Sequence, residues 1–330
     1  MNTLVDPFGR QISYLRLAVT DRCNLRCQYC MPEKGIDIVP RQELLTFKEM
    51  YRITRVLSEL GVDKIRLTGG EPFVRKDFIS LVKSLSHNDR LDQINITTNG
   101  ALVKDHISTL EKLKVKSINL SIDSLQPAKF LRITRRDQFT RVWEAYLELL
   151  KSSLQLKLNV VVQSGFNTDE IVDFIKLTEK EDIAVRFIEE MPLNGKGQRK
   201  VKENWDFKRI LDHIAETYDS FDSVASGKSS TSRNYRVEGY KGTFGIIPAF
   251  TRTICNDCNR IRITATGLFK NCLFDDGVFD LKPILRSSAS DDELKQIFIE
   301  TISKKPRNGF EAEANRTVGG VSESMSTIGG

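Results

Sequence analysis

Long apolar runs are missing from the sequence, and histidine and tryptophan are scarce. The 330 residues include three histidines and two tryptophans. No stretch approaches the ~18 apolar residues of a membrane-spanning helix, and the N-terminus lacks the apolar core of about 7–15 residues that a signal peptide carries. No heptad array or internal repeat is present, which excludes coiled coils and solenoids. We therefore expect a cytoplasmic protein with no membrane contact.

A strong excess of one charge is absent as well. Fifty Lys and Arg residues against 44 Asp and Glu give a net charge of +6, and the basic residues are spread along the chain. This mild excess suits an anionic small ligand as well as a nucleic acid, but a nucleic-acid-binding domain would cluster its basic and aromatic residues. We expect no nucleic-acid partner. A zinc-dependent nucleic-acid-binding protein is the alternative from another functional class.

What the chain does contain is six cysteines in two groups of three. In a reducing compartment, such groups indicate metal binding or catalysis rather than disulfides. The first group is Cys23, Cys27 and Cys30, spaced Cys-x3-Cys-x2-Cys. Thiolates select iron–sulfur, zinc or copper, yet three ligands are one fewer than a closed structural site takes. A four-iron cluster on three cysteines would leave one iron open for a small molecule; the alternatives are a zinc loop lacking a ligand and buried thiols.

The second group is Cys255, Cys258 and Cys272, near the C-terminus. Zinc is the serious alternative here, because Cys-x2-Cys pairs are typical of structural zinc loops. However, no fourth cysteine is near, the three histidines lie elsewhere in the chain, and carboxylates such as Asp275 are uncommon fourth ligands. The pattern favours a second iron–sulfur cluster with an open iron.

Strands alternate with helices over the first two thirds of the chain. This order indicates βα units and a parallel sheet. We expect an α/β fold, an incomplete (β/α)6 TIM-type barrel in residues 1–222, followed by a small C-terminal cluster-binding domain in residues 223–330 with short strands. The predicted barrel strands are 14–19, 64–68, 93–98, 117–122, 156–162 and 184–188, and the predicted helices are 47–60, 77–85, 106–113, 139–150, 169–180 and 205–218.

Polar residues occupy alternate positions of these strands, which puts each set on one face of the sheet. Burying so many unpaired polar groups in a structural core would cost too much, so we infer a wet, ligand-holding cavity. Arg260 and Arg262 share a face of a later strand and add two cations, so that a triphosphate would fit. The inward-facing set is Arg16, Arg66, Thr68, Asn95, Thr97, Asn119, Ser121, Lys157, Asn159 and Arg186.

The first cysteine motif, with Tyr29 before its last cysteine, resembles that of the S-adenosylmethionine radical enzymes. Gly69-Gly70-Glu71-Pro72, directly after a predicted strand, is similar to the segment that grips the methionine amino group in them. The resemblance implies that a cluster on the first cysteines binds S-adenosylmethionine and that one electron releases a 5′-deoxyadenosyl radical. The cofactor contacts that it implies are Tyr29, Gly70, Ser121 and Met191.

The two cysteine groups together with Asn259-Arg260-Ile261-Arg262 and the terminal Gly329-Gly330 resemble the GTP 3′,8-cyclase family, which catalyses the first step of molybdenum cofactor biosynthesis. This resemblance implies two 4Fe–4S clusters, GTP as substrate and an external electron donor, and it suggests a homodimer. It assigns no catalytic side chain. The alternative is a radical enzyme with an auxiliary cluster that acts on a peptide. The implied GTP contacts are Arg16, Arg66, Thr97, Lys157, Arg260, Ile261 and Arg262.

The small, polar residues 322–330 form the tail. A disordered end is the plain interpretation. Our hypothesis is that the tail enters the cavity, because two terminal glycines can pass where side chains would clash and a free carboxylate could pair with the arginines.

Overall fold

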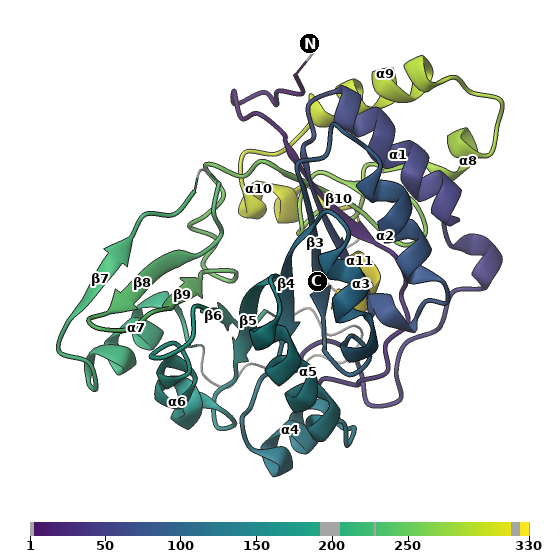
Figure 1. The fold of residues 1–330 in the computed structure, drawn as a ribbon. Coiled ribbons are helices and arrows are strands. Elements are labelled where there is room, and N and C mark those ends of the chain that lie inside the picture. Colours follow the sequence, from purple (N-terminus) through teal and green to yellow (C-terminus); the bar gives the residue numbers. More distant parts are fainter. Residues whose placement is uncertain (1–2, 192–204, 228, 318–323, 330) are drawn as a thin grey trace.

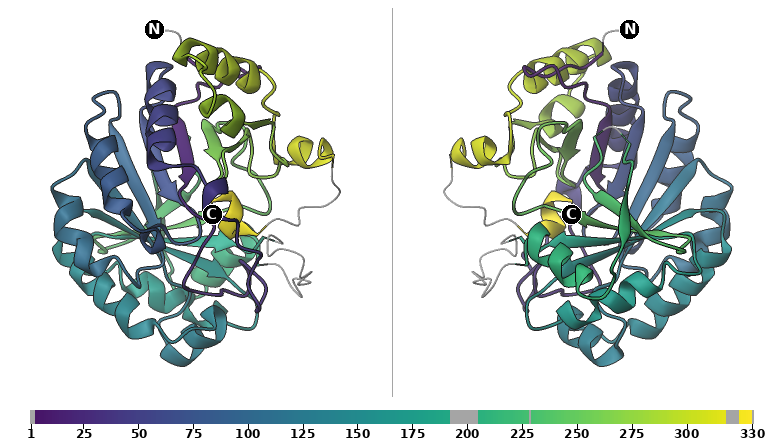
Figure 2. Two further views of the ribbon diagram at one scale, coloured as in Figure 1. Left: turned by 90° about the vertical axis from the view of Figure 1, so that its right-hand side faces the viewer. Right: turned by 90° about the vertical axis from the view of Figure 1, so that its left-hand side faces the viewer.

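One curved, open β-sheet organises the molecule (Figures 1 and 2). The computed structural model describes residues 3–191, 205–227, 229–317 and 324–329. The strand order is β12-β11-β10-β1-β2-β3-β4-β5-β6-β9-β8-β7, and the run from β10 to β9 is parallel throughout. The sheet is rich in parallel strands and does not close, as expected for a partial TIM-type barrel.

The six predicted barrel strands are confirmed, with ends that move by no more than about two residues, the usual scatter of strand assignment. Their apolar side chains, such as Leu15 and Phe187, are buried in the main core, while the polar residues alternate with them. The strands are β1 (Tyr14–Ala18), β2 (Lys64–Thr68), β3 (Gln93–Thr98), β4 (Val115–Ser121), β5 (Gln155–Val162) and β6 (Ala184–Glu189).

Helices cover the convex face of this sheet (Figure 2). The first helix begins at a capping box formed by Thr46 and Glu49 and ends before Gly61, which has a φ of +98°. Helix α4 was not predicted, although Pro127 stands in its first turn, where proline is favoured. The helices are α1 (Phe47–Glu59), α2 (Phe78–Ser86), α3 (Ile107–Glu111), α4 (Pro127–Thr134), α5 (Phe139–Lys151), α6 (Ile171–Lys176) and α7 (Phe207–Ala215), with short 3-10 helices at Arg41–Glu43, Pro72–Val74, Lys104–His106 and Thr168–Glu170.

The C-terminal third extends the same sheet at both edges. Strand β9 pairs with β6, and β10 pairs with β1, each in parallel. The predicted boundary between residues 222 and 223 falls inside β7 and stays a prediction. The remaining elements are β7 (Phe221–Val224), β8 (Arg233–Val237), β9 (Thr243–Ile247), β10 (Arg260–Ile263), β11 (Leu268–Lys270), β12 (Phe279–Asp280), α8 (Lys282–Leu285), α9 (Asp291–Ile302), α10 (Gly309–Ala314) and α11 (Met325–Ile328).

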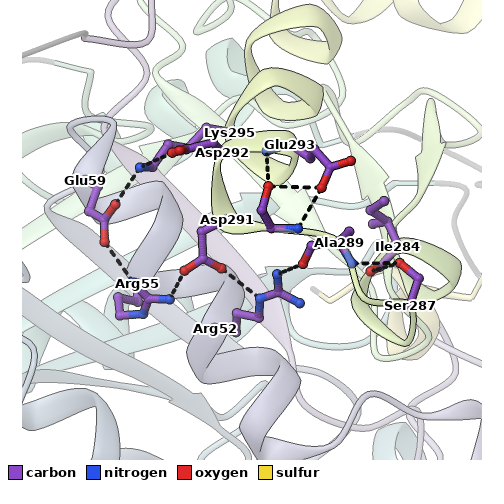
Figure 3. A network of polar contacts seen from close by, with 11 residues as sticks. Arg52, Arg55, Glu59, Ile284, Ser287, Ala289, Asp291, Asp292, Glu293 and Lys295 are labelled. Atoms are coloured by element: carbon purple, nitrogen blue, oxygen red, sulfur yellow. Dashed lines mark hydrogen bonds and ion pairs between the residues drawn. The ribbon is translucent and has the colours of Figure 1, made fainter.

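A network of ion pairs attaches α9 to α1 (Figure 3). Asp291 at the start of α9 accepts a hydrogen bond from Arg52 Nε at 2.8 Å and also pairs with Arg55. Glu59 at the end of α1 pairs with Arg55 and with Lys295, each at 3.0 Å. These contacts join the C-terminal third to the first helix of the barrel. Within the described residues, no helix is both long and apolar enough to span a membrane.

Candidate active site

The concave side of the sheet encloses a cavity of about 680 Å3. Every residue of the inward-facing set lines it except Asn95, which is buried and bonds to Ser117 and to the carbonyl of Ile65. Both cysteine groups line it as well. The prediction that these polar side chains line a cavity is therefore confirmed, except for Asn95, and the two cysteine groups line the same cavity. That the cavity holds a ligand stays a prediction.

The first cysteines lie in the loop after β1, as free cysteines that are half-buried as whole residues. The loop is fixed from within, because the N–H groups of Cys30 and Met31 both donate to the carbonyl of Cys27, at 3.0 and 3.1 Å. Cys23 Sγ accepts hydrogen bonds from Leu25 N–H at 3.4 Å and from the Asn99 side chain at 3.7 Å. Three thiols in one short loop, with N–H donors to one of the sulfurs, are a donor set that suits an iron–sulfur cluster.

Burial controls the acid–base state of these thiols. Burial, with the nearby charge of Glu71, raises the pKa of Cys23 to about 11, and burial, with Cys23 as a neighbour, raises the pKa of Cys30 to about 12. Burial also raises the pKa of Cys27 well above its usual range. Metal ligation requires thiolates, so binding of a metal group here must release protons.

Close packing of the backbone requires glycine at positions 69 and 70. Gly69 has a φ of +148°, and a Cβ there would lie 2.4 Å from the carbonyl oxygen of Thr20. A Cβ on Gly70 would lie 2.2 Å from the carbonyl oxygen of Arg22. The two glycines therefore let the end of β2 pack directly against the segment that leads into the cysteine loop.

The four predicted S-adenosylmethionine contacts, Tyr29, Gly70, Ser121 and Met191, all line the cavity. The Tyr29 hydroxyl donates a hydrogen bond to Asp123 Oδ2 at 2.8 Å, and Asp123 Oδ1 accepts one from Val161 N–H at 2.8 Å. Asp123 thus holds the ring of Tyr29 at the cavity wall. Contact of these residues with a cofactor stays a prediction.

The second cysteines are also free thiols, around the start of β10 and the end of β11. Cys258 N–H donates to the carbonyl of Cys255 at 3.2 Å, and Cys272 N–H donates to Asp275 Oδ2 at 2.7 Å. Burial alone would raise the pKa of Cys258, but the charges of Lys305 and Arg260 lower it to about 7. Among the residues that the structure describes, no three His, Cys, Asp or Glu side chains are grouped so that they could hold a single metal ion.

Three arginines stand side by side across the sheet. Arg262 of β10 is in register with Arg16 of β1, which is in register with Arg66 of β2. Neighbouring strands are about 4.8 Å apart, so these like charges are close. Lys157 and Arg186 add further charge from β5 and β6.

Six cations of the cavity have no carboxylate partner in the part of the chain that the structure describes. Among the described residues, none of the cations Lys64, Arg66, Lys157, Arg186, Arg260 and Arg262 forms an ion pair with Asp or Glu. The carboxylates at the cavity wall have other partners: Glu71 bonds to Thr98 and Asn99, and Glu189 bonds to Thr251.

The crowding shifts several pKa values. Burial, followed by the charges of Arg186 and Arg66, lowers the pKa of Lys157 to about 7. Burial lowers the pKa of Arg186 and of Arg262 to about 10. Arg66 Nε donates to the Tyr14 hydroxyl at 2.6 Å, and Arg66 and Arg16 lower the pKa of Tyr14 to about 8, against the effect of burial. A polyanion bound in the cavity would offset the repulsion between these cations and raise the lowered pKa values again.

Of the predicted GTP contacts, Arg16, Arg66, Thr97, Lys157, Arg260 and Arg262 line the cavity. Ile261 is the exception, because its side chain is fully buried in the main core on the opposite face of β10. Sequence reasoning missed Lys64 and Tyr14, which also line the cavity. The strand period was a usable signal, since they stand two residues from Arg66 and Arg16.

The described part of the tail lies at the cavity, in agreement with the hypothesis. Met325 and Ser326 of α11 line the cavity, and Arg262 Nη1 donates to the carbonyl of Gly329 at 2.7 Å. Ser324 Oγ donates to the carbonyl of Cys30 at 2.7 Å. The part of the hypothesis that concerns Gly330 and its carboxylate lies outside the described residues.

This fold and cysteine loop define a radical S-adenosylmethionine enzyme, and the family model described as Radical SAM superfamily matches residues 17–178. A second model, Molybdenum Cofactor Synthesis C, matches residues 183–311. Within that class, the chain belongs to the GTP 3′,8-cyclase family: the GTP 3′,8-cyclase of Syntrophomonas wolfei is 40% identical over 319 residues, 95% of this chain and 98% of that protein.

Other relatives are longer. Human molybdenum cofactor biosynthesis protein 1 is 40% identical over 305 residues, which make up 92% of this chain and 48% of that protein. The chain thus spans about half the length of the animal relatives it matches. The solved structure of Streptococcus suis SuiB bound to S-adenosylmethionine is 15% identical, with a TM-score of 0.59 over 86% of this chain and 68% of that one, and it supports the fold alone.

Proposed function

We propose that the chain is a GTP 3′,8-cyclase, which converts GTP to (8S)-3′,8-cyclo-7,8-dihydroguanosine 5′-triphosphate in the first step of molybdenum cofactor biosynthesis. The observation that carries this proposal is the row of Arg262, Arg16 and Arg66 inside a cavity that both cysteine groups line. A triphosphate carries several negative charges that suit such a row of cations, and guanidinium groups bind phosphate through paired hydrogen bonds.

Two 4Fe–4S clusters and S-adenosylmethionine are the proposed cofactors. Cys23, Cys27 and Cys30 would hold the first cluster, and Cys255, Cys258 and Cys272 the second. When bound, S-adenosylmethionine and a reduced first cluster supply the radical that abstracts hydrogen from the C3′ of GTP ribose. Tyr29, Gly70, Ser121 and Met191 would orient the cofactor.

The chain's own residues then position the substrate. Lys157 and the arginines would bind the triphosphate, and the Thr97 hydroxyl would bond to the sugar or base. The enclosing sheet limits access of water, which protects a reactive carbon radical and keeps the reacting atoms close. An external electron donor, a homodimer and a cytoplasmic location complete the proposal.

Metal analysis followed by an isotope experiment tests it. Protein purified without oxygen should contain about eight irons, since each cluster holds four, and little zinc. With dithionite as reductant, it should form 5′-deoxyadenosine only when GTP is present, with ATP as the matched control. Deuterium at C3′ of GTP should appear in the 5′-deoxyadenosine, whereas deuterium at C2′ should not.

The opposite results would redirect the assignment. About four irons plus zinc, the content of one cluster and one zinc site, would refute the second cluster. Formation of 5′-deoxyadenosine at the same rate without GTP would refute the substrate and favour the alternative, a radical enzyme that acts on a peptide.

A further inference from the structure

A buried lysine, Lys305, lies beside the second cysteine group and does not line the cavity. Lys305 follows α9 and is 4% exposed. Its Nζ donates to the carbonyl oxygen of Arg260 at 2.7 Å and to that of Asn271. Arg260 follows Cys258 by two residues, and Asn271 directly precedes Cys272. A single ammonium group therefore joins the two segments that carry these cysteines.

The remaining cysteine of the group is tied to the same part of the chain. Arg10 Nη1 donates to the carbonyl of Cys255 at 2.8 Å and to that of Arg307 at 2.7 Å, while Nη2 donates to the carbonyl of Pro306 at 2.8 Å. Arg10 has a carboxylate partner, Asp6, at 2.5 Å. Residues 305–307 thus support all three cysteine segments.

Lys305 differs from Arg10 in its counter-charge. Among the residues that the structure describes, no Asp or Glu forms an ion pair with Lys305. Asp275, the carboxylate of this region, accepts hydrogen bonds from the N–H groups of Cys272 and Gly277, at 2.7 and 3.0 Å, and lies 3.9 Å from the ammonium of Lys270. Carbonyl oxygens alone leave a buried ammonium without a neutralising anion, which is costly.

Two cysteines of the group lie close along the chain to the residues that bind Lys305, and Asp275 is also within its electrostatic reach. The two carbonyls that accept from Lys305 Nζ belong to residues within two positions of Cys258 and Cys272, so the ammonium charge stands beside the segments that carry these sulfurs. A four-iron cluster on three thiolates carries a net negative charge that grows when the cluster is reduced, so a fixed positive charge beside it stabilises the reduced form.

We propose that Lys305 is a positioning residue and the buried counter-ion of the metal centre at Cys255, Cys258 and Cys272, and that it raises the reduction potential of that centre. This inference rests on the proposed second cluster. The neighbouring Lys304 is exposed and offers a matched control for the loss of one lysine charge.

The test is a potentiometric titration of the anaerobic holoenzyme, followed by electron paramagnetic resonance. S-adenosylmethionine, which binds at the first cluster, separates the two signals. At a fixed potential, Lys305→Met should lower the ratio of reduced to oxidised second cluster at least tenfold, about 59 mV for one electron, and leave the first cluster unchanged. Lys305→Arg should restore most of the ratio, and Lys304→Met should match the unmodified protein.

Three other results of these measurements would support or overturn the role of Lys305. An unchanged potential of a fully loaded second cluster in Lys305→Met overturns the proposal. Lys305→Met could lose the second cluster altogether. In that case, a second cluster retained in Lys305→Arg supports the role of the charge. Loss of the cluster in both variants shows that the shape of the lysine side chain matters, and it overturns the proposal. Zinc in the unmodified protein overturns the second cluster itself, a result obtained before any variant is made.

Discussion

Lys157 shows, at the scale of one residue, how the cavity's cations act on one another. An isolated lysine has a pKa of about 10.4, but burial and the charges of Arg186 and Arg66 lower the pKa of Lys157 to about 7. At pH 8 the free protein therefore holds this amine mostly neutral. A bound triphosphate would favour the charged form and raise the pKa again.

GTP binding should consequently depend on pH through Lys157. Below pH 7 the amine is charged in both free and bound protein, so it contributes no pH dependence. Above pH 7 binding must take up a proton, and the affinity should fall by up to about tenfold per pH unit. Calorimetry at pH 8 in two buffers of different ionisation enthalpy should show proton uptake that Lys157→Met reduces to the share of Tyr14, whose pKa is about 8. Lys116→Met, at an exposed position, should retain the full uptake. Equal uptake in all three proteins would contradict this explanation.

Gly70→Ala should disturb the first cysteine group selectively. The new Cβ would lie 2.2 Å from the carbonyl oxygen of Arg22, so the segment before Cys23 must move. We expect loss of about four irons, the content of one cluster, with the second cluster retained as the internal control. Iron analysis together with paramagnetic resonance of the reduced protein checks this. Full iron content with unchanged S-adenosylmethionine binding would show that the loop absorbs the extra methyl group.

At the scale of elements, the contact between α9 and α1 includes one carboxylate, Asp291, that pairs with two arginines (Figure 3). Asp291→Asn should lower the free energy of unfolding by about 1 kcal/mol, because partly exposed ion pairs contribute about 0.2–1 kcal/mol each. Urea denaturation at low salt measures this, and added salt should shrink the difference.

Asp292→Asn is the matched control for that change. Asp292 also stands in the first turn of α9 but is 90% exposed and pairs only with Lys295. Both variants remove one charge from the first turn, so they share any effect on the helix dipole, but only Asp291→Asn removes the ion pairs with Arg52 and Arg55 of α1. Equal destabilisation by both would assign the effect to the dipole.

The six βα units could be predicted because each strand and most helices show an apolar repeat in their own sequence. The two-residue repeat of strands also correctly placed Arg260 and Arg262 on one face of β10. It also implies that Ile261, between them, faces the core, so that only its backbone is left to contact GTP. Helix α4 was missed because the proline in its first turn is an isolated signal. Lys305 could not be predicted, since it follows another lysine at a helix end and nothing local distinguishes a buried ammonium from an exposed one.

At the scale of the whole molecule, strands that follow residue 240 pair with both edge strands of the barrel sheet: β9 pairs with β6, and β10 pairs with β1. No local pattern records that β10 will pair with β1, far earlier in the chain, because such pairing depends on the complete sheet. Ile261, Phe244 and Phe298 belong to the same hydrophobic core as the barrel strands. The barrel region and the C-terminal third therefore share one sheet and one hydrophobic core.

A fragment of residues 1–222 should therefore fail to fold cooperatively. Without β9 and β10 it exposes the backbone edges of β6 and β1 and part of the shared core, a combination that promotes aggregation. Size-exclusion chromatography and near-ultraviolet circular dichroism should show aggregated or loosely packed protein, whereas residues 1–317 should remain compact. A sharp unfolding transition of the short fragment would instead establish it as an independent domain.

The pairing of β10 with β1 also sets an order of events during synthesis. Cys23, Cys27 and Cys30 leave the ribosome long before Arg260 and Arg262, and at about 5–20 residues per second the delay is tens of seconds. Throughout that interval the strand next to the first cysteines has an open flank. The nascent chain thus keeps this flank of β1 unpaired until residues 260–263 have been synthesised and can form β10.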